Sequence, residues 1–360
     1  MSDPLFTPLQ AGAFRIPNRI IMAPLTRCRA AEGRVPNRIM ADYYAQRASF
    51  GMILSEATSV CPMGVGYPDT PGIWSEAQVA GWREVTREVH EAGGTILLQL
   101  WHVGRISDPV YLDGGTPVSA SAVRPAGHVS LMRPQKPFEM PRALALEEIP
   151  GIIRSYHQGA EYAMAAGFDG VEIHAANGYL IDQFLQDSTN QRTDAYGGPI
   201  ENRARLLLEV TDAVNSVWGA DRVGVHLAPR CDAHDMGDSA PAALFGHVAR
   251  ELGKRRLAFL CARESLDHPD VPALSPMMKR EFGGVFIANE GFTAESARKA
   301  VASGSADAVA FGKAAIANPD LVERIRTGAE WNVPDADSFY GGGDKGYLDY
   351  PFIQPSSNPL

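Results

Sequence analysis

Three polar side chains follow one short apolar run and could do chemistry together. His174, Asn177 and Tyr179 lie close to one another at the end of the run Gly170–His174. His174 and Asn177 can each donate a hydrogen bond to one oxygen atom, and the phenol of Tyr179 can give a proton to a carbon beside that oxygen. These groups would suit the reduction of a polarised double bond. In the simpler alternative, His174 is satisfied by backbone at a strand end and Tyr179 lies at the surface.

The elements that must position these residues are short β-rich runs, each followed by helical or irregular sequence. Most are continuous apolar runs, which are typical of parallel strands buried on both faces. The runs are Arg19–Ala23, Met52–Ala57, Thr95–Trp101, Gly170–His174, Val223–Ala228, Ala258–Ala262, Val285–Asn289 and Ala308–Gly312. Amphipathic stretches between them include Ser75–Ala92, Leu146–Ala166, Ile200–Trp218, Ala242–Lys254, Thr293–Ser303 and Pro319–Thr327.

Eight such strand and helix units predict an α/β fold of the (β/α)8 TIM barrel type. We expect residues 1–360 to form one domain. The segment from about 105 to 141, after the third strand, is rich in Pro, Gly and Ser and predicts a loop or hairpin subdomain that caps the barrel mouth. The tail from Asn332 onward is similarly irregular, and we expect both segments to lie near the active face.

The carboxyl ends of the strands form the active face of such a barrel, and candidate residues lie at the ends of seven of the eight predicted strands. Besides His174, Asn177 and Tyr179, the candidate cofactor-binding residues at these ends are Ala23, Pro24, Leu25, Thr26, Ala57, Gln99, His226, Arg230, Asn289, Gly291, Gly312 and Lys313. One of these residues alone would most simply be a satisfied loop residue. Their recurrence across the strands indicates a site.

Two features of these ends indicate the ligand. Gly291, Gly312 and Lys313 offer backbone amides and a positive charge to a phosphate, at the starts of the helices that follow the last two strands. Thr26 and Gln99 offer the hydroxyl and amide that a flat heterocycle would need. Aromatic walls could come from Tyr67, Trp101 and Tyr340. A phosphate site and a flat polar pocket on one barrel together predict flavin mononucleotide (FMN).

Composition excludes several other classes of protein. The net charge of −9, without a strong cluster of Lys and Arg, disfavours nucleic acid as a partner. No apolar run approaches the ~18 residues needed to cross a bilayer. The four cysteines have no paired spacing, and the first residues lack a signal-peptide pattern, so we expect a cytoplasmic enzyme that acts on small molecules. Whether it is a monomer or a homodimer stays open.

Longer motifs extend the pattern over nearly the whole chain. They are Ala23-Pro-Leu-Thr-Arg27, Tyr43-Tyr-Ala-Gln-Arg-Ala48, Gln99-Leu-Trp-His-Val-Gly-Arg105, His174-Ala-Ala-Asn-Gly-Tyr179, Thr189-Asn-Gln-Arg-Thr-Asp-Ala-Tyr-Gly-Gly198, Glu201-Asn-Arg203, Phe311-Gly-Lys313 and Ile316-Ala-Asn-Pro319. With these motifs in this order, the chain resembles the old yellow enzyme family of FMN-dependent ene-reductases. The resemblance is closest to bacterial xenobiotic reductases, which attack nitrate esters and nitroaromatics, and to N-ethylmaleimide reductase-like flavoproteins.

The resemblance implies a role for each matching residue. Thr26 would hydrogen-bond a flavin carbonyl, Gln99 would hold the pyrimidine edge, and Gly291, Gly312 and Lys313 would bind the FMN phosphate. His174 and Asn177 would grip the substrate's oxygen, and Tyr179 would protonate its α-carbon, while Tyr67, Trp101 and Tyr340 would line the substrate pocket. The expected reaction is a two-step hydride transfer from NADH or NADPH, through tightly bound FMN, to α,β-unsaturated carbonyls, maleimides or nitroalkenes.

The chain departs from the family pattern at the charged positions. Many members carry arginine in place of His226, where a fixed charge faces the pyrimidine edge, and in place of Lys313. An imidazole titrates near neutrality and an arginine does not. Either a protonated His226 or the nearby Arg230 would therefore supply the charge. The first strand supplies Thr26 rather than the cysteine of another branch, so Cys28 is not expected to tune the cofactor.

Two other classes of function remain as alternatives. A metal-dependent barrel hydrolase could use His102, His174 and His226, which follow or end three predicted strands. However, the chain has no His-X-His pair, and the phosphate-type residues would then be idle, so we expect no metal. A catalytically silent ligand-binding barrel is the other alternative. A flavin spectrum that bleaches with a reduced nicotinamide would separate these alternatives from the reductase.

Overall fold

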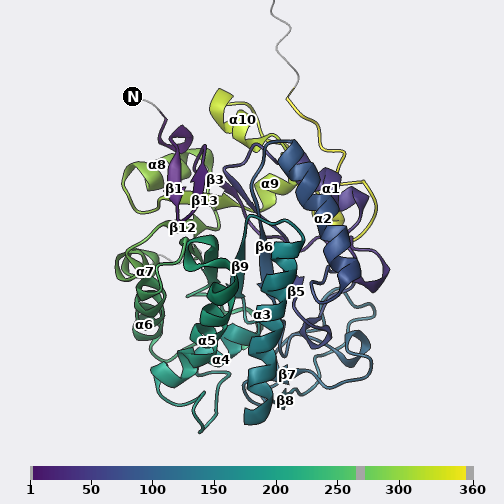
Figure 1. Ribbon diagram of the computed structural model, residues 1–360, viewed down its shortest axis with the longest axis vertical. Helices are drawn as coiled ribbons and strands as arrows, with labels where there is room; N and C mark the ends of the chain where they lie inside the picture. Colours follow the sequence, from purple (N-terminus) through teal and green to yellow (C-terminus); the bar gives the residue numbers. More distant parts are fainter. Residues whose placement is uncertain (1–2, 265–271, 354–360) are drawn as a thin grey trace, which may run out of the picture.

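Eight parallel strands close into a barrel in the computed structural model, which describes residues 3–264 and 272–353 (Figure 1). In order around the barrel the strands are β4 (Met52–Leu54), β3 (Ile20–Met22), β13 (Ala308–Phe311), β12 (Phe286–Asn289), β11 (Phe259–Arg263), β10 (Val223–Leu227), β9 (Gly170–Ala175) and β6 (Ile96–Trp101). Pairing of β4 with β6 closes the ring. The predicted TIM barrel is therefore confirmed, and each predicted run overlaps one barrel strand.

The boundaries differ most at the second predicted strand. The run Met52–Ala57 was expected to be continuous, but β4 ends at Leu54, and a separate short strand β5 (Thr58–Ser59) pairs with the far end of β6. Between them, the buried Glu56 turns toward the side chain of Tyr44 and the backbone of Arg27. The break in pairing leaves Ala57 outside the ladder, at the edge of the barrel mouth.

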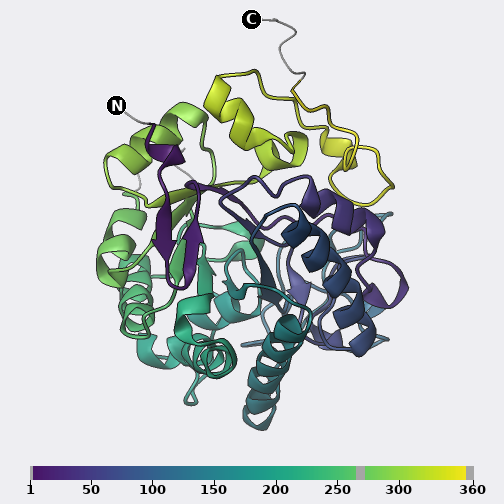
Figure 2. The ribbon, with the colours of Figure 1, turned by 45° about the horizontal axis from the view of Figure 1, so that its top comes forward.

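The helices pack around the barrel (Figure 2). They are α1 (Arg38–Ala45), α2 (Glu76–Glu91), α3 (Ile149–Ala165), α4 (Leu180–Leu185), α5 (Ile200–Trp218), α6 (Pro241–Lys254), α7 (Ser275–Phe282), α8 (Ala294–Ala302), α9 (Lys313–Ala317) and α10 (Leu321–Thr327). Short 3-10 turns lie at Pro4–Phe6, Glu32–Arg34, Pro62–Gly64, Pro109–Tyr111, Leu146–Glu148, Ala220–Arg222, Ala233–Asp235 and Ala336–Ser338. A capping box at Ser75 and Gln78 begins α2. The sequence-predicted helices all lie in these regions.

A hairpin that the sequence analysis did not predict closes the amino-terminal end of the barrel. Strands β1 (Leu9–Ala11) and β2 (Phe14–Ile16) pair antiparallel around Gly12, whose φ of 55° and close approach to Asp221 both require glycine. The apolar side chains of β2 join the cluster inside the barrel that includes Phe259 and Cys261. This end of the barrel is thus filled, and the opposite end is left for ligands.

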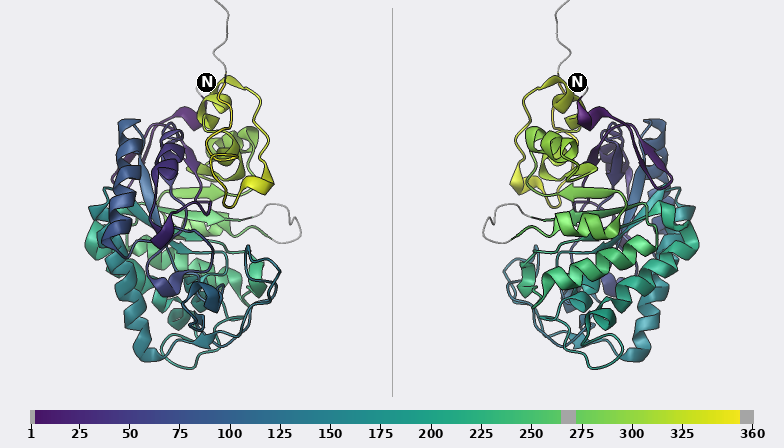
Figure 3. Two further views of the ribbon diagram at one scale, coloured as in Figure 1. Left: turned by 90° about the vertical axis from the view of Figure 1, so that its right-hand side faces the viewer. Right: turned by 90° about the vertical axis from the view of Figure 1, so that its left-hand side faces the viewer.

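The segment 105–141 contains little regular structure. Its short strand β7 (Val118–Ser119) pairs in parallel with β8 (Arg142–Ala143), and a bridge joins His128 to Pro137 in antiparallel fashion. Val129 and Phe138 pack in one apolar cluster with Trp101, at the end of β6. The segment and the tail lie on the same side of the barrel (Figure 3).

Two arginines after β3 hold the tail. The Arg27 guanidinium donates to the carbonyls of Phe339 at 2.9 Å and Gly346 at 2.8 Å, and Arg29 donates to Gly343 at 3.1 Å. Arg27 also lies over the rings of Tyr43 and Tyr347, which stack at 4.1 Å. These contacts between distant parts of the sequence fix the tail beside the barrel mouth. Among the described helices, none is long and apolar enough to span a bilayer.

Candidate active site

A pocket opens at the carboxyl ends of the barrel strands and brings together most of the predicted site residues. Its lining contains Pro24, Leu25, Thr26, Ala57, Tyr67, Gln99, Trp101, His174, Asn177, Tyr179, Lys313 and Tyr340, together with Ile316 and Phe339, which the sequence analysis did not name. The tail supplies Phe339 and Tyr340, because the two arginines described above hold it there. The candidate catalytic and substrate-binding residues therefore share one cavity.

His174 is buried at the end of β9 and serves as a neutral donor. Its Nδ1 accepts a hydrogen bond from the backbone N–H of Ala176 at 3.3 Å, which assigns the proton of the neutral ring to Nε2. Burial lowers the pKa of His174 well below its ordinary value, and the nearby His226 and Arg263 lower it further. The ring can thus offer an Nε2–H to a ligand without carrying a charge.

Asn177 is held in a tight turn beyond His174. Its φ of 58° is left-handed, a conformation that asparagine tolerates, and Gly178 follows with a φ of 78°. The buried Asp182 fixes this turn by accepting a hydrogen bond from the Gly178 N–H at 2.9 Å. The Asn177 Oδ1 accepts a hydrogen bond from Arg263 at 2.8 Å. The amide group of Asn177 therefore remains able to donate elsewhere.

Tyr179 lies in an aromatic wall of the pocket. Its hydroxyl is 2.8 Å from the hydroxyl of Tyr67, and its ring meets Trp101 edge to face at 5.0 Å and His174 at the same distance. Burial raises the pKa of Tyr179 well above its ordinary value, with Tyr67 adding to the effect. The phenol therefore keeps its proton at neutral pH. The indole Nε1 of Trp101 is buried and has no partner among the described residues.

Gln99 and Thr26 have the groups that a flavin ring requires. The Gln99 Nε2 donates to the buried Glu172 Oε2 at 2.7 Å, so its Oε1 is left to accept a hydrogen bond from a ring N–H. Thr26 offers a hydroxyl from the loop after β3, and the exposed Lys313 offers an amine on the same cavity. An acceptor, a hydroxyl and a cation in one pocket fit the pyrimidine edge, a ring carbonyl and the phosphate of FMN.

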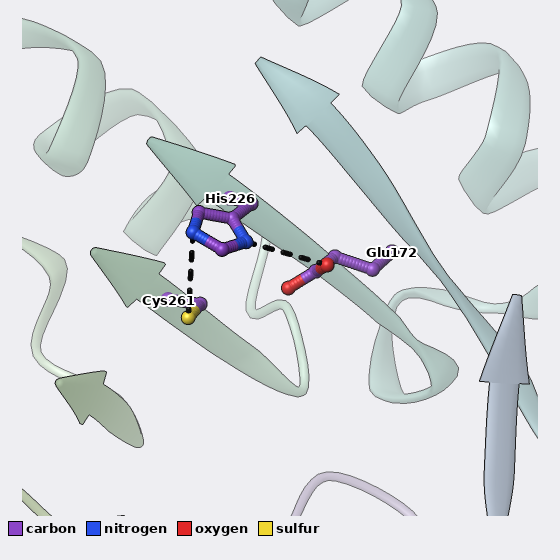
Figure 4. Close-up of side chains that lie close together, drawn as sticks. All are labelled: Glu172, His226 and Cys261. Atoms are coloured by element: carbon purple, nitrogen blue, oxygen red, sulfur yellow. Dashed lines mark hydrogen bonds and ion pairs between the residues drawn. The ribbon is translucent and has the colours of Figure 1, made fainter. Parts of the chain in front are cut away.

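His226 is not on the lining of this pocket; it lies inside the barrel, opposite His174 in the pairing of β10 with β9, and Figure 4 shows it between Glu172 and Cys261. It is 3% exposed, with Nδ1 at 3.5 Å from Glu172 Oε2 and Nε2 at 3.9 Å from the Cys261 sulfur. Its ring lies nearly parallel to that of His174, with the centroids 6.0 Å apart. The two polar contacts use opposite ring nitrogens, so the imidazole lies between Glu172 and Cys261. Burial and Glu172 raise the pKa of the Cys261 thiol well above its ordinary value.

The other predicted cofactor ligands are not on the lining of the pocket. Ala23 is buried, and its backbone N–H donates to the carbonyl of Phe311 in β13 at 3.0 Å. The Asn289 side chain donates to the Ala310 carbonyl at 2.9 Å. Gly291 has a φ of 75° and faces open space, while Gly312 is the N-cap residue of α9, next to Lys313. Arg230 pairs at 2.7 Å with Glu264, the residue that follows β11.

Arg263 is a site residue that sequence reasoning missed. It ends β11, which continues one residue beyond the predicted run Ala258–Ala262, and no functional residue was assigned to that run. Its guanidinium pairs with Glu290 at 2.9 Å and donates to Asn177 at 2.8 Å. The alternation of inward-facing Phe259 and Cys261 would have placed the next inward residue, Arg263, at the barrel mouth.

The histidines of the alternative hydrolase do not form one ligand set. His102 accepts a hydrogen bond from the Gly104 N–H at 3.0 Å, and burial lowers its pKa to about 3. Across the described ranges, the one group of candidate metal ligands is Glu172, His226 and Cys261, which includes neither His102 nor His174. The residues of the hydrolase hypothesis are therefore not arranged as that hypothesis requires.

Comparison with known proteins agrees with this geometry. Residues 4–332 match the model of the NADH:flavin oxidoreductase / NADH oxidase family. A probable flavin mononucleotide-dependent alkene reductase of Leishmania infantum is 44% identical over 98% of each chain, and 12-oxophytodienoate reductase 7 of Oryza sativa subsp. japonica is 43% identical over 98% of this chain and 96% of the relative.

Solved structures are also similar over nearly the whole chain. Morphinone reductase in complex with tetrahydroNAD has a TM-score of 0.93 and 48% identity, with 99% of each chain covered. The old yellow enzyme homologue from Zymomonas mobilis has a TM-score of 0.94 and 46% identity, covering 97% of this chain and 99% of the other.

The chain belongs to the NADH:flavin oxidoreductase / NADH oxidase family. Within that family it is an FMN-dependent oxidoreductase of the old yellow enzyme type, as the resemblance of its motifs implied.

Proposed function

We propose that this protein uses NADH or NADPH to reduce activated alkenes, including α,β-unsaturated carbonyls, maleimides and nitroalkenes, and also nitrate esters and nitroaromatics. The observation that carries the proposal is the arrangement of three protonated groups on one cavity. A neutral His174 with its proton on Nε2, the amide of Asn177 and the phenol of Tyr179 all line it. Such a set matches an acceptor that gains charge on oxygen and a proton on carbon.

FMN would be held by residues from several strand ends. Gln99 Oε1 would accept from the pyrimidine ring, Thr26 would donate to a ring carbonyl, and Lys313 would pair with the phosphate, beside the glycines Gly291 and Gly312. His226, opposite His174 in the strand register and 3.5 Å from Glu172, would compensate negative charge at the pyrimidine edge. When bound, FMN supplies two-electron redox chemistry, in which a hydride from the nicotinamide is passed on to the substrate.

The chain's own residues then polarise and protonate the substrate. His174 Nε2–H and Asn177 Nδ2–H would hold the substrate's carbonyl or nitro oxygen, and preorganised donors of this kind contribute roughly 3 to 4 kcal/mol each in other enzymes. The hydride adds at the β-carbon, the carbon–carbon π bond breaks, and the Tyr179 hydroxyl gives its proton to the α-carbon. Tyr179 regains a proton from solvent, so the net reaction consumes the alkene, the reduced nicotinamide and one proton.

We also propose that residues 1–360 act as one domain, with the segment 105–141 capping the site. Its Val129 and Phe138 pack in the same cluster as Trp101, and Tyr67 and Tyr179 lie against that cluster. Exclusion of water by this cover would strengthen the hydrogen bonds inside the pocket. The unpaired state of Cys28, Cys61, Cys231 and Cys261 supports a cytoplasmic location.

The proposal is tested on the protein as purified. We expect a yellow flavin spectrum that bleaches on addition of NADH or NADPH without oxygen and returns when an enone or a nitroalkene is added. A panel of enones, maleimides, nitroalkenes and nitrate esters under both nicotinamides would define the substrate class. Protein that carries flavin but is not reoxidised by any member of the panel would overturn the proposed reaction.

A further inference from the structure

We infer that Arg263, held by Glu290, is a positioning residue that sets the orientation of the Asn177 amide and so presents its N–H group to the substrate. The inference rests on the proposed function, because that function requires Asn177 to act as a donor. An asparagine side chain offers an oxygen on one side and an NH2 group on the other. Only one of its two flipped orientations can stabilise negative charge on a substrate oxygen.

The chemistry of Arg263 selects that orientation. A guanidinium has only donors, so its partner atom on Asn177 must be the oxygen, as the Nη1 to Oδ1 distance of 2.8 Å shows. With Oδ1 engaged, Nδ2 is left for the cavity that Asn177 lines. Rotation of the amide would place two donors against each other and lose the hydrogen bond. Since the Asn177 backbone is already fixed in its turn, Arg263 controls the remaining freedom of the side chain.

Glu290 holds Arg263 in place. Its carboxylate takes two contacts from the guanidinium, with Nε at 2.9 Å and Nη2 at 3.0 Å, in the bidentate geometry that favours arginine over lysine. This leaves Nη1 pointing to Asn177, with the Cys231 sulfur at 3.9 Å. Glu290 itself has a φ of 89°, which is costly for a residue other than glycine. The two partners lie at the paired ends of β11 and β12, where Arg263 is opposite Asn289.

The test measures binding of a phenol, 4-hydroxybenzaldehyde, to the flavin-bound protein through the long-wavelength charge-transfer band of phenolate with oxidised flavin. Replacement of Arg263 by Met should raise the Kd about tenfold, the factor that follows from losing about 1.4 kcal/mol. Arg263→Met leaves the Glu290 carboxylate without its ion-pair partner. The double variant Arg263→Met/Glu290→Gln removes that charge as well, and it should show the same loss, because the loss comes from the missing guanidinium. Arg263→Lys should recover little, since it cannot make the bidentate contact.

A double-mutant cycle with Asn177→Ala separates positioning from direct contact. If Arg263 acts through Asn177, Arg263→Met will cause no further loss in the Asn177→Ala background. A tenfold loss that persists there would show that Arg263 touches the ligand itself, and an unchanged Kd in Arg263→Met would show that it has no role. Either result overturns the inference while leaving the reductase intact.

A second measurement does not depend on flavin or activity. The side-chain NH2 signals of Asn177 in a ¹⁵N-labelled sample are identified by their loss in Asn177→Ala. They should shift in Arg263→Met and remain in place in Asp212→Asn, which alters a distant surface ion pair with Arg255. Unchanged Asn177 signals in Arg263→Met would contradict the inference, whether or not the protein binds flavin. A protein that binds no flavin would refute the proposed function instead.

Discussion

The hydroxyl oxygens of Tyr67 and Tyr179 lie 2.8 Å apart, so the phenol proposed as proton donor is held by a second phenol. The two residues come from different loops, and Trp101 packs against both rings. Burial raises the pKa of each phenol. Both therefore remain protonated at neutral pH, and Tyr67 can orient the Tyr179 hydroxyl toward the substrate.

Replacement of Tyr179 by Phe should lower turnover with weakly activated enones by a factor of about 10² to 10⁴, the usual contribution of a general acid. Tyr67→Phe is the matched control, because it keeps the ring and the donor and removes only the supporting hydroxyl. We expect it to cost less than about tenfold, as for one neutral hydrogen bond. Stopped-flow measurements should show that flavin reduction by the nicotinamide is unchanged in both. Slowed reduction in Tyr179→Phe would count against its assignment.

A second prediction concerns the pH dependence of ligand binding. The pKa of His174 lies well below its ordinary value, so the ring is already neutral at about pH 6. We therefore expect no proton to leave His174 between about pH 5.5 and 8. Phenolate binding, once corrected for ionisation of the phenol, should therefore show no histidine step in this range. A titration followed by the charge-transfer band checks this. A step near pH 6.5 that disappears in His174→Asn would show that the histidine is charged in the free enzyme.

The third prediction concerns His226, which lies between Glu172 and Cys261 inside the barrel. An imidazole can take up a proton when negative charge develops on a reduced cofactor, whereas the charge of an arginine is fixed. The flavin midpoint potential should therefore fall more steeply with pH in the wild type than in His226→Arg. Potentiometric titrations of both proteins from about pH 6 to 9 would measure the slopes. Equal slopes would mean that His226 does not supply the compensating charge.

The fourth prediction concerns stability. Burial raises the pKa of Asp182 from 3.8 to about 7 in the folded protein, so the folded state binds this proton more tightly than the unfolded state does. The free energy of unfolding should therefore decrease as the pH rises from about 4 to about 7, with a contribution on the order of 3 kcal/mol from this carboxyl. In Asp182→Asn, the difference between urea unfolding at about pH 5 and at about pH 7.5 should shrink by that amount.

Glu56 provides the independent comparison for that experiment. It is also buried, and its pKa is raised to about 7, but it lies beside Arg27 and Tyr44 rather than in the turn of Asn177. Glu56→Gln should thus reduce the same pH dependence. If the pH dependence in both variants equals that of the wild type, these carboxyls do not titrate as their burial implies.

The barrel could be predicted because its strands and helices each have a recognisable pattern within a short stretch of sequence. Each strand core is a nearly continuous apolar run, and each long helix has its own amphipathic pattern. The β1–β2 hairpin was missed because each of its strands has only three residues. The hairpin packs against the amino-terminal end of the barrel, and that surface forms only when strands from distant parts of the sequence have paired. The early end of β4 was missed for a related reason, since Glu56 leaves the ladder to meet Tyr44.

The site was predictable to the extent that parallel strands end on one face. That rule brought together Thr26, Gln99, His174 and Tyr179 from four separate places in the sequence. The rule does not say which atom of an amide faces the ligand. For Gln99 this is decided by Glu172, on the neighbouring β9, and for Asn177 by Arg263, on a strand that is not its neighbour. Such partners depend on side-chain reach across the barrel, which no local pattern records.

The clamp of Arg27 and Arg29 on the tail has a consequence for the order in which the protein matures during synthesis. All eight barrel strands have been translated once Phe311 has been added, yet Phe339 and Tyr340, which complete the pocket wall, come later. A nascent chain could therefore close its barrel before the pocket is finished. The pocket would become able to discriminate between ligands only in a later step, when the backbone carbonyls of residues 338–346 accept hydrogen bonds from Arg27 and Arg29.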